Sequence, residues 1–193
     1  MESSPVRNLV LCFFLASLAH AQQWVKTEFR DDLHNETGVK FALDAKEKGG
    51  AIQVVCSKGK LKAAWLFTDK VADVQVKQNL IGDLSSEVDV EYRRDDEPKP
   101  HHLSLPVSKD FHGILLQRSH GFADVADKGT FTGLENLLYG PAGLGGGEWR
   151  KNKKANNWAK RLIVGVSAFG ESDAVYTFDV PDPSGIRQEC DIK

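Results

Sequence analysis

Apolar and polar residues alternate along most of this chain, a pattern typical of half-buried β-strands. In residues 39–45 and 87–94 the apolar side chains fall on every second position. The stretch 51–67 reads AIQVVCSKGKLKAAWLF, which predicts two strands joined at Lys58-Gly59. Glycine accepts the positive φ that a tight hairpin turn requires. Further strands are predicted at residues 22–29, 71–76, 102–107, 111–117, 163–169 and 174–180.

Helical patterns are few and short. The clearest is NNWAKRL at residues 156–162, where Asn156 or Asn157 can cap a helix. Trp158 and Leu162 would then lie one turn apart on the same face. A second short helix is predicted at residues 184–190, capped by Ser184, and residues 134–138 allow at most one helical turn.

This pattern predicts an all-β fold. About nine short strands, spaced by roughly 8–12 residues and separated by few helices, favour an antiparallel β-sandwich, either immunoglobulin-like or a partly open barrel. An α/β fold is excluded because no helical run of about 10–15 residues separates the strands. The strand-rich region is long enough for one domain with a full core.

The first residues have the pattern of a signal peptide. Arg7 precedes an apolar run of 11 residues, LVLCFFLASLA, which is too short to span a bilayer. Ala19-His20-Ala21 then supplies the small residues that a signal peptidase recognises. We therefore expect residues 1–21 to be removed near Ala21, leaving 193 − 21 = 172 residues, 22–193, as one extracytoplasmic domain. A buried N-terminal helix is the alternative.

The charge balance excludes several classes of partner. The chain has 25 basic and 27 acidic residues, so no overall field attracts nucleic acid or anionic lipid. No later stretch is long and apolar enough for stable membrane insertion. The sequence contains no motif that predicts a cofactor or a metal site.

Two cysteines remain after the leader, Cys56 in the hairpin and Cys190 near the end of the chain. An even number of cysteines in an oxidising compartment favours a disulfide, which here would fasten the C-terminal segment to the central hairpin. Two free buried thiols and a catalytic Cys56 thiol are the alternatives. The second would need a cation or a helix N-terminus to lower the thiol pKa.

Residues 119–154 interrupt the strand pattern with a glycine-rich excursion that ends in WRKNKK. Aromatic residues interleaved with cations can bind anionic polymers or acidic protein faces. A solvated loop followed by a helix is the simpler interpretation. The candidate binding surface comprises Trp149, Arg150, Lys151, Lys153, Lys154, Lys160 and Arg161.

An enzymatic alternative involves His102, Asp110 and His112, which could meet across a hairpin as an envelope hydrolase or a metal-dependent site. Ser108 would complete the residue types of a hydrolase triad. No strained nucleophile turn or metal-binding motif supports this arrangement. The sequence favours a turn capped by the oxygens of Ser108 or Asp110 instead.

Several short motifs follow one another along the chain: Trp24, VCSKGKL at 55–61, VEYRRDD at 90–96, Ser108-Lys109-Asp110, AKRL at 159–162, TFDV at 177–180 and Cys190. Their order resembles that of small secreted bacterial proteins of the TagO/VasI type, which are associated with type VI secretion. The chain departs from that family at Leu105-Pro106, where an aromatic residue is usual, and in the insertion at residues 119–154.

The resemblance implies an extracytoplasmic β-sandwich with a Cys–Cys bond and no established catalytic chemistry. Together with the residue patterns, it predicts a non-enzymatic exported protein that binds a protein partner or an envelope component. More specifically, the resemblance predicts that the protein is an accessory of a secretion system.

Overall fold

The computed structural model describes residues 22–31, 36–78, 84–116, 132–140 and 147–190. The predicted signal peptide and its cleavage site lie outside these residues. The described strands are β1 (Val25–Asp31), β2 (Glu36–Asp44), β3 (Ala51–Ser57), β4 (Lys60–Phe67), β5 (Gln75–Gln78), β6 (Leu84–Arg94), β7 (His101–Pro106), β8 (Gly113–Leu115), β9 (Arg161–Val166) and β10 (Ala174–Asp179). The described helices are α2 (Thr132–Tyr139), α3 (Gly147–Lys154) and α4 (Ser184–Glu189).

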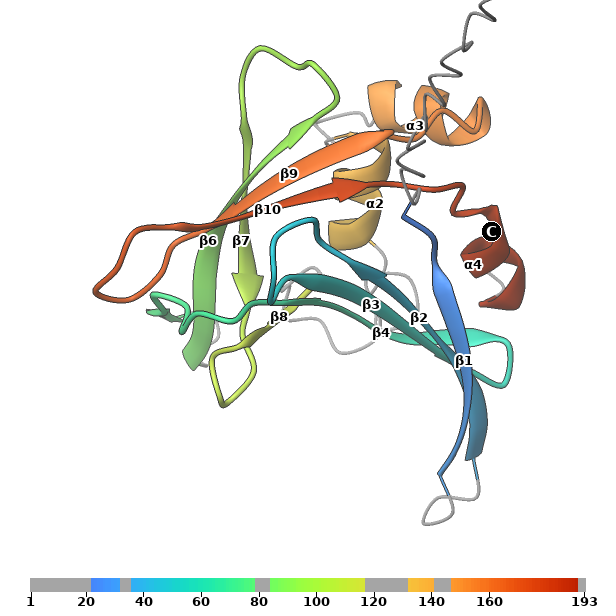
Figure 1. Ribbon diagram of the computed structural model, residues 1–193, viewed down its shortest axis with the longest axis horizontal. Coiled ribbons are helices and arrows are strands. Elements are labelled where there is room, and N and C mark those ends of the chain that lie inside the picture. The colour runs from blue at the N-terminus through green and yellow to red at the C-terminus, as the bar shows by residue number, and fades with distance from the viewer. Residues whose placement is uncertain (1–21, 32–35, 79–83, 117–131, 141–146, 191–193) are drawn as a thin grey trace, which may run out of the picture.

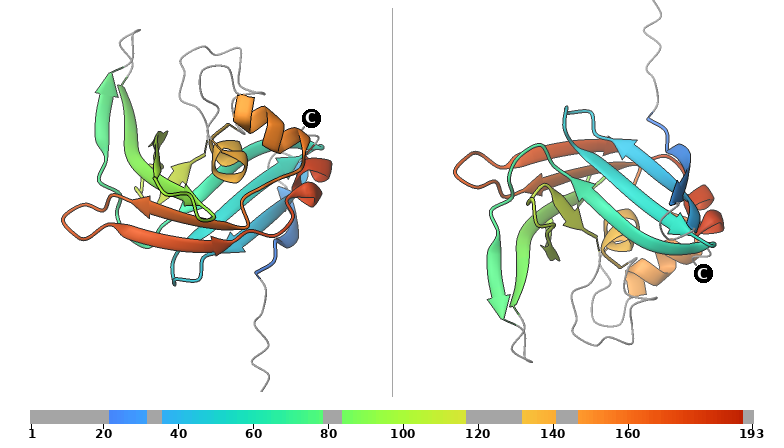
Figure 2. Two further views of the ribbon diagram at one scale, coloured as in Figure 1. Left: turned by 90° about the horizontal axis from the view of Figure 1, so that it is seen from above. Right: turned by 90° about the horizontal axis from the view of Figure 1, so that it is seen from below.

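The strands form two antiparallel sheets (Figures 1 and 2). One has the order β1-β2-β3-β4-β8, and the other has the order β10-β9-β6-β5 with β7 also paired to β6. A single bridge between Val107 and Ile114 links the end of β7 to β8. The described strands do not close into a barrel. The predicted antiparallel β-sandwich is therefore confirmed.

The β3–β4 hairpin forms as the sequence predicts. Ile52, Val54 and Cys56 point into the core from one face of β3. Lys58 and Gly59 both adopt positive φ, 52° and 71°. Two consecutive positive φ values give the turn a twist that matches the twist of the flanking strands.

Helix α2 lies inside the hydrophobic core. Its Leu134, Leu137 and Leu138 are buried and belong to the same cluster as the inward side chains of both sheets. Gly133 permits the close approach, because a Cβ there would lie 2.8 Å from the backbone carbon of Leu116. The sequence predicted one helical turn in a loop at this place, whereas the structure has a two-turn core element.

The helix predicted at residues 156–162 is wrong. The basic helix lies earlier, at α3, and Asn156 ends it in the left-handed region at φ 52°. Asparagine tolerates this conformation, and so it can stop a helix as well as start one. Arg161 and Leu162 belong to β9, where they pair with Asp179 and Phe178.

Two other boundaries differ from the prediction. The strand expected at 71–76 is limited to β5, and Ala72 forms only an isolated bridge to Ala168. Helix α4 is present, but Ser184 does not cap it. The residue at the N-cap is Pro183, and the Ser184 N–H donates to Asp182 Oδ1 at 2.8 Å.

The structure contains the Cys56–Cys190 disulfide, with a Cα–Cα distance of 5.4 Å. Both cysteines are buried, and Ile186 of α4 is buried beside them in the core. The bond joins β3 to the residue that follows α4. The predicted fastening of the C-terminal segment to the central hairpin is confirmed.

None of the described helices has the length and apolarity that a bilayer crossing requires.

Candidate functional site: the outer face of α3

One face of α3 is fixed to the core through α2. Asn152 Nδ2 donates to the Tyr139 carbonyl oxygen at 2.9 Å, and Lys153 Nζ lies 2.6 Å from Glu135 Oε1. Side chains one position apart on a helix point about 100° apart, so this pair leaves the opposite face outward. Helix α3 therefore packs on α2 (Figure 2).

The opposite face of α3 carries three exposed cations, Arg150, Lys151 and Lys154. Their spacing places them within one third of the helix circumference. None of them forms an ion pair with a residue that the structure describes. The cations near the end of the helix also complement the negative end of its dipole. We call these three residues the α3 basic face.

The carboxylate beneath α3 is held in an apolar setting. Burial raises the pKa of Glu135, and the neighbouring Lys153 and Arg187 lower it in part. The Glu135 side chain is 8% exposed and that of Lys153 is 16% exposed. This ion pair therefore orients α3 on the core, and Lys153 attaches the helix instead of facing solvent.

Lys160 and Arg161 lie beyond α3, where the chain enters β9. Their backbone N–H groups both donate to Asp95 Oδ1, at 2.7 and 2.9 Å. The Lys160 ammonium lies 3.1 Å from the centroid of the Trp158 ring, a cation–π contact. Trp158 Nε1 donates to the Val180 carbonyl at 3.2 Å, so this tryptophan links the residues before β9 to those after β10.

The seven residues of the predicted binding surface thus divide by role. Three form the α3 basic face, and Lys153 points to the core. Lys160 and Arg161 sit at a strand entry beside the carboxylate of Asp95. The side chain of Trp149 lies outside the described part of the chain. The prediction that this region binds a partner stays a prediction.

The residues of the enzymatic alternative make separate contacts. His102 Nδ1 lies 3.4 Å from Glu91 Oε1 on an exposed part of the second sheet. His112 Nδ1 donates to the Thr68 carbonyl at 3.0 Å. Among the described residues, no group of three or more His, Cys, Asp or Glu is placed to hold a metal ion.

Asp110 and Ser108 stabilise the turn between β7 and β8. Ser108 Oγ donates to Asp110 Oδ1 and accepts the Gly113 N–H at 2.9 Å. The hydrogen bond from Ser108 and the backbone N–H of His112 lower the pKa of Asp110. The turn-capping interpretation is confirmed.

Sequence reasoning missed a buried arginine at the end of β6. Arg94 is 5% exposed, and its Nη1 lies 3.3 Å from Glu97 Oε1. Glu97 Oε2 in turn lies 3.1 Å from His101 Nε2. A Cβ at Gly140 would lie 2.3 Å from Arg94 Nη1, so the guanidinium fills the space at the C-terminal end of α2. The only sequence signal was the basic-acidic run at residues 93–96.

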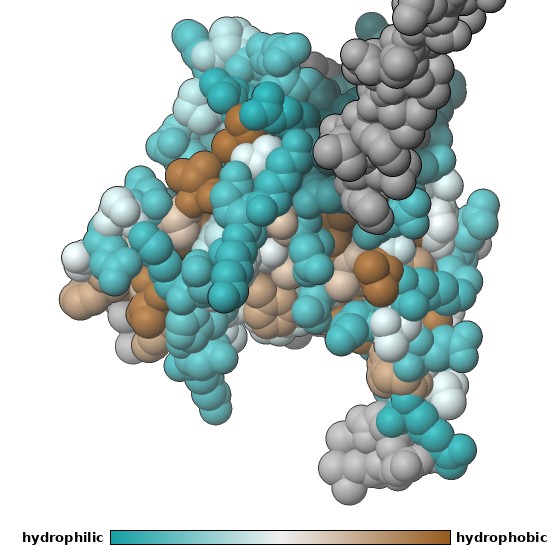
Figure 3. Space-filling view, viewed as in Figure 1, coloured by the Kyte–Doolittle hydropathy of each residue, from teal (hydrophilic) through white to brown (hydrophobic). Residues whose placement is uncertain are grey.

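The outer face of the second sheet has a shallow hollow of about 250 Å³. Gly165 lies at this hollow between the apolar side chains of Ile163 and Val175, and Glu91 and Arg93 border it. Figure 3 shows apolar side chains over β9 and β10 on a mostly polar surface. Val175 is 52% exposed there.

No family model, curated protein or solved structure matches this chain. The fold and the site define a disulfide-bonded antiparallel β-sandwich that carries a basic helix on its surface. The resemblance to the TagO/VasI type stays a prediction that rests on the short motifs.

Proposed function

We propose that this protein is an exported, non-enzymatic binding protein, and that its α3 basic face holds an anionic partner outside the cytoplasm. The partner would be an acidic face of a protein or an anionic component of the envelope. Both present carboxylate or phosphate groups, the chemistry that lysine and arginine recognise.

The extracytoplasmic location is supported by two features. The Cys56–Cys190 disulfide is of the kind that persists in oxidising compartments. The sequence of residues 1–21 has the pattern of a cleavable signal peptide. We infer that the protein works after export and cleavage near Ala21.

The observation that carries the binding proposal is the contrast between the two faces of α3. Lys153 faces inward and is neutralised by Glu135. Arg150, Lys151 and Lys154 face outward without a carboxylate from the described part of the chain. A cluster of unneutralised cations on a firmly packed helix creates a local positive potential in a chain with nearly balanced charge.

The resemblance to secretion-associated proteins supports a finer proposal, in which the anionic partner is a component of a secretion apparatus. Capture of such a component by the exported protein, and its loss in a variant of the α3 basic face, would support that finer form.

The test reverses the charge of the α3 basic face with the triple substitution Arg150→Glu, Lys151→Glu and Lys154→Glu. Two probes distinguish the sources of the anion: immobilised polyglutamate supplies carboxylates, and phosphatidylglycerol vesicles supply phosphates. We expect the wild-type protein to bind at least one probe, with affinity that falls as salt rises. The triple variant should bind that probe at least about tenfold more weakly.

A matched control makes the same change in net charge elsewhere. Lys48→Glu, Lys60→Glu and Lys109→Glu alter three exposed lysines that lie outside α3. This control should keep wild-type affinity. Equal loss in both triple variants would show attraction by net charge alone, and absence of binding to either probe by the wild-type protein would overturn the proposal.

A further inference from the structure

Strand β1 is a seven-residue edge of the first sheet. It pairs with β2 along its whole length, from Val25 opposite Ala42 to Asp31 opposite Glu36. In Figure 1 it forms the outer strand of its sheet, away from β3 and β4. Within the described part of the chain, no other strand pairs with β1. Alternate backbone N–H and C=O groups on its outer side therefore lack a ladder partner there.

The edge strand β10 of the second sheet differs from β1, because other segments of the chain cover its outer side. On the outer side of β10, the Lys46 N–H donates to the Thr177 carbonyl oxygen at 2.8 Å, and the Glu47 carboxylate accepts the Thr177 N–H. The Gln22 side chain accepts the Asp179 N–H at 2.5 Å. The short edge strand β8 is joined to the end of β7 by the bridge at Ile114.

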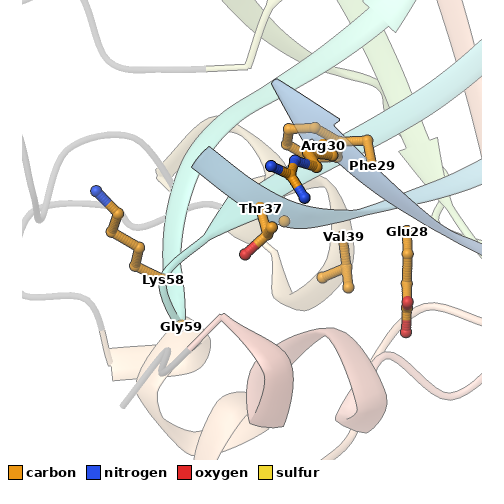
Figure 4. Close-up of a pocket in the computed structure, with 8 residues that line it drawn as sticks. Glu28, Phe29, Arg30, Thr37, Val39, Lys58 and Gly59 are labelled. Carbon is orange, nitrogen blue, oxygen red and sulfur yellow. The ribbon is translucent and has the colours of Figure 1, made fainter. Parts of the chain in front are cut away.

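The side chains of β1 alternate between two faces. Glu28 lies opposite Val39 in the ladder, and both project from the same side of the hairpin over a cavity of about 550 Å³ (Figure 4). By the period of two, Lys26 and Arg30 share that side. Val25, Thr27 and Phe29 lie on the other side. Val25 is 59% exposed.

This pattern is self-complementary when two copies of β1 run antiparallel. Pairing about Thr27 places Lys26 opposite Glu28 of a second copy twice, once on each side of the two-fold axis. The same register places Val25 opposite Phe29 of the second copy and Thr27 opposite itself. Directly opposite side chains stay on one face, so unlike charges meet and the exposed valines are covered.

The adjacent two-fold registers are unfavourable. Pairing about Glu28 places Lys26 opposite Arg30 and Glu28 opposite itself, so every charged pair is repulsive. Pairing about Lys26 places that lysine opposite itself. A hydrogen-bonded antiparallel ladder between identical strands needs a two-fold axis at a residue, so Thr27 is preferred to its two neighbours.

We propose that β1 is a self-association edge, through which two copies of the protein form an antiparallel β1–β1 ladder centred on Thr27. The occupant of the edge is a second copy of this chain. The interface is isologous, because each copy contributes the same strand. Main-chain hydrogen bonds supply affinity. The Lys26 ammonium already lies 2.6 Å from Glu189 Oε1 of its own chain, and its three donors allow it to bind Glu28 of the second copy as well, which selects the register.

The first test is disulfide trapping with Thr27→Cys in the exported protein. The native cysteines are already bonded to each other, so the introduced thiol is free. Opposite residues in a ladder lie about 4.5–5.5 Å apart, within the range that a disulfide spans. We expect a covalent dimer on mild oxidation, seen by non-reducing electrophoresis. Glu28→Cys should form no covalent dimer, because in this register Glu28 lies opposite Lys26 and not opposite itself. Equal cross-linking of both variants would overturn the register.

The second test uses charge and needs no cross-link. Glu28→Lys places lysine opposite Lys26 in both pairs and should weaken the dimer about tenfold in sedimentation equilibrium. The triple variant Lys26→Glu/Glu28→Lys/Glu189→Lys exchanges these charges, keeps unlike charges at positions 26 and 189, and should restore association. A wild-type protein that is monomeric up to about 0.5 mM would overturn the proposal, since a specific complex is expected well below the millimolar range. Failure of the charge exchange to rescue Glu28→Lys would overturn it as well.

Discussion

At the residue scale, two ion pairs of identical chemistry differ in burial. Lys153–Glu135 and Lys26–Glu189 both have an Nζ–Oε1 distance of 2.6 Å. The side chains of the first pair are 16% and 8% exposed, and those of the second are 42% and 44% exposed. Water therefore competes more strongly with the second pair than with the first. Equal distances therefore do not imply equal contributions to stability.

We predict that Glu135→Gln lowers the free energy of unfolding by about 3 kcal/mol, because it leaves the Lys153 ammonium partly buried without its carboxylate. The matched change Glu189→Gln removes an exposed pair and should cost less than about 1 kcal/mol. Urea unfolding of both variants measures the difference. Equal destabilisation would mean that burial does not distinguish the two pairs.

Local contacts at this scale were predictable, and distant ones were not. The turn-capping role of Ser108 and Asp110 follows from residues a few positions apart, and the structure has those hydrogen bonds. Lys153 was placed on the surface because its neighbours in the chain are polar. Its partner Glu135 lies 18 residues earlier, on a helix whose burial depends on the packing of both sheets.

At the element scale, one of the contacts that cover the edge of β10 comes from a side chain of the β2–β3 turn. The Glu47 carboxylate accepts the Thr177 N–H on the open side of the strand. Burial alone would raise the pKa of Glu47, but the hydrogen bonds from Thr177 and the charge of Lys46 lower it overall. A carboxyl whose pKa is lowered in the folded state stabilises the fold at pH values above its ordinary pKa of 4.5.

We predict that this contribution is lost as the pH falls through 4.5 toward the lowered pKa of Glu47. Glu47→Gln keeps an acceptor but has no charge to lose. The wild-type protein should therefore be slightly more stable than the variant at pH 7, and the gap should close at about pH 3. Urea midpoints at the two pH values test this. A gap that is unchanged by pH would assign the stabilisation to the hydrogen bond alone.

The strands and α4 were predicted well, whereas α2 and α3 were predicted poorly, for a physical reason. Alternation is a property of a single strand against a core, so the β3–β4 hairpin is visible in its own residues. The apolar side chains of α2 follow glycines and have no long period, and they read as loop. Asn156 is equally suited to begin or end a helix, and only the αL conformation it adopts decides between them.

At the scale of the whole molecule, one covalent bond connects the middle of the first sheet to the last described residue. Cys56 and Cys190 are separated by 134 positions, so the loop between them includes β4 to β10 and all three described helices. The pairing was predictable from the count of cysteines after the predicted signal peptide. Which element would be fixed was not, because the packing of α4 on the core depends on Ile186.

We predict that removal of the disulfide by Cys56→Ala/Cys190→Ala lowers the free energy of unfolding by at most about 5 kcal/mol. This is the chain-entropy value for a loop of this length, and any strain in the native bond reduces it. In this variant, unfolding should begin at α4, because the helix is then attached mainly by Ile186 and by the exposed Lys26–Glu189 pair. Hydrogen exchange should show faster opening of the α4 amides, such as the N–H at position 190 that is bonded to the Ile186 carbonyl, while β3 and β4 stay protected.

Reduction of the wild-type protein should reproduce the effect without any substitution. If the α4 amides remained as protected as those of β3, apolar packing rather than the covalent bond would hold the C-terminal segment on the core.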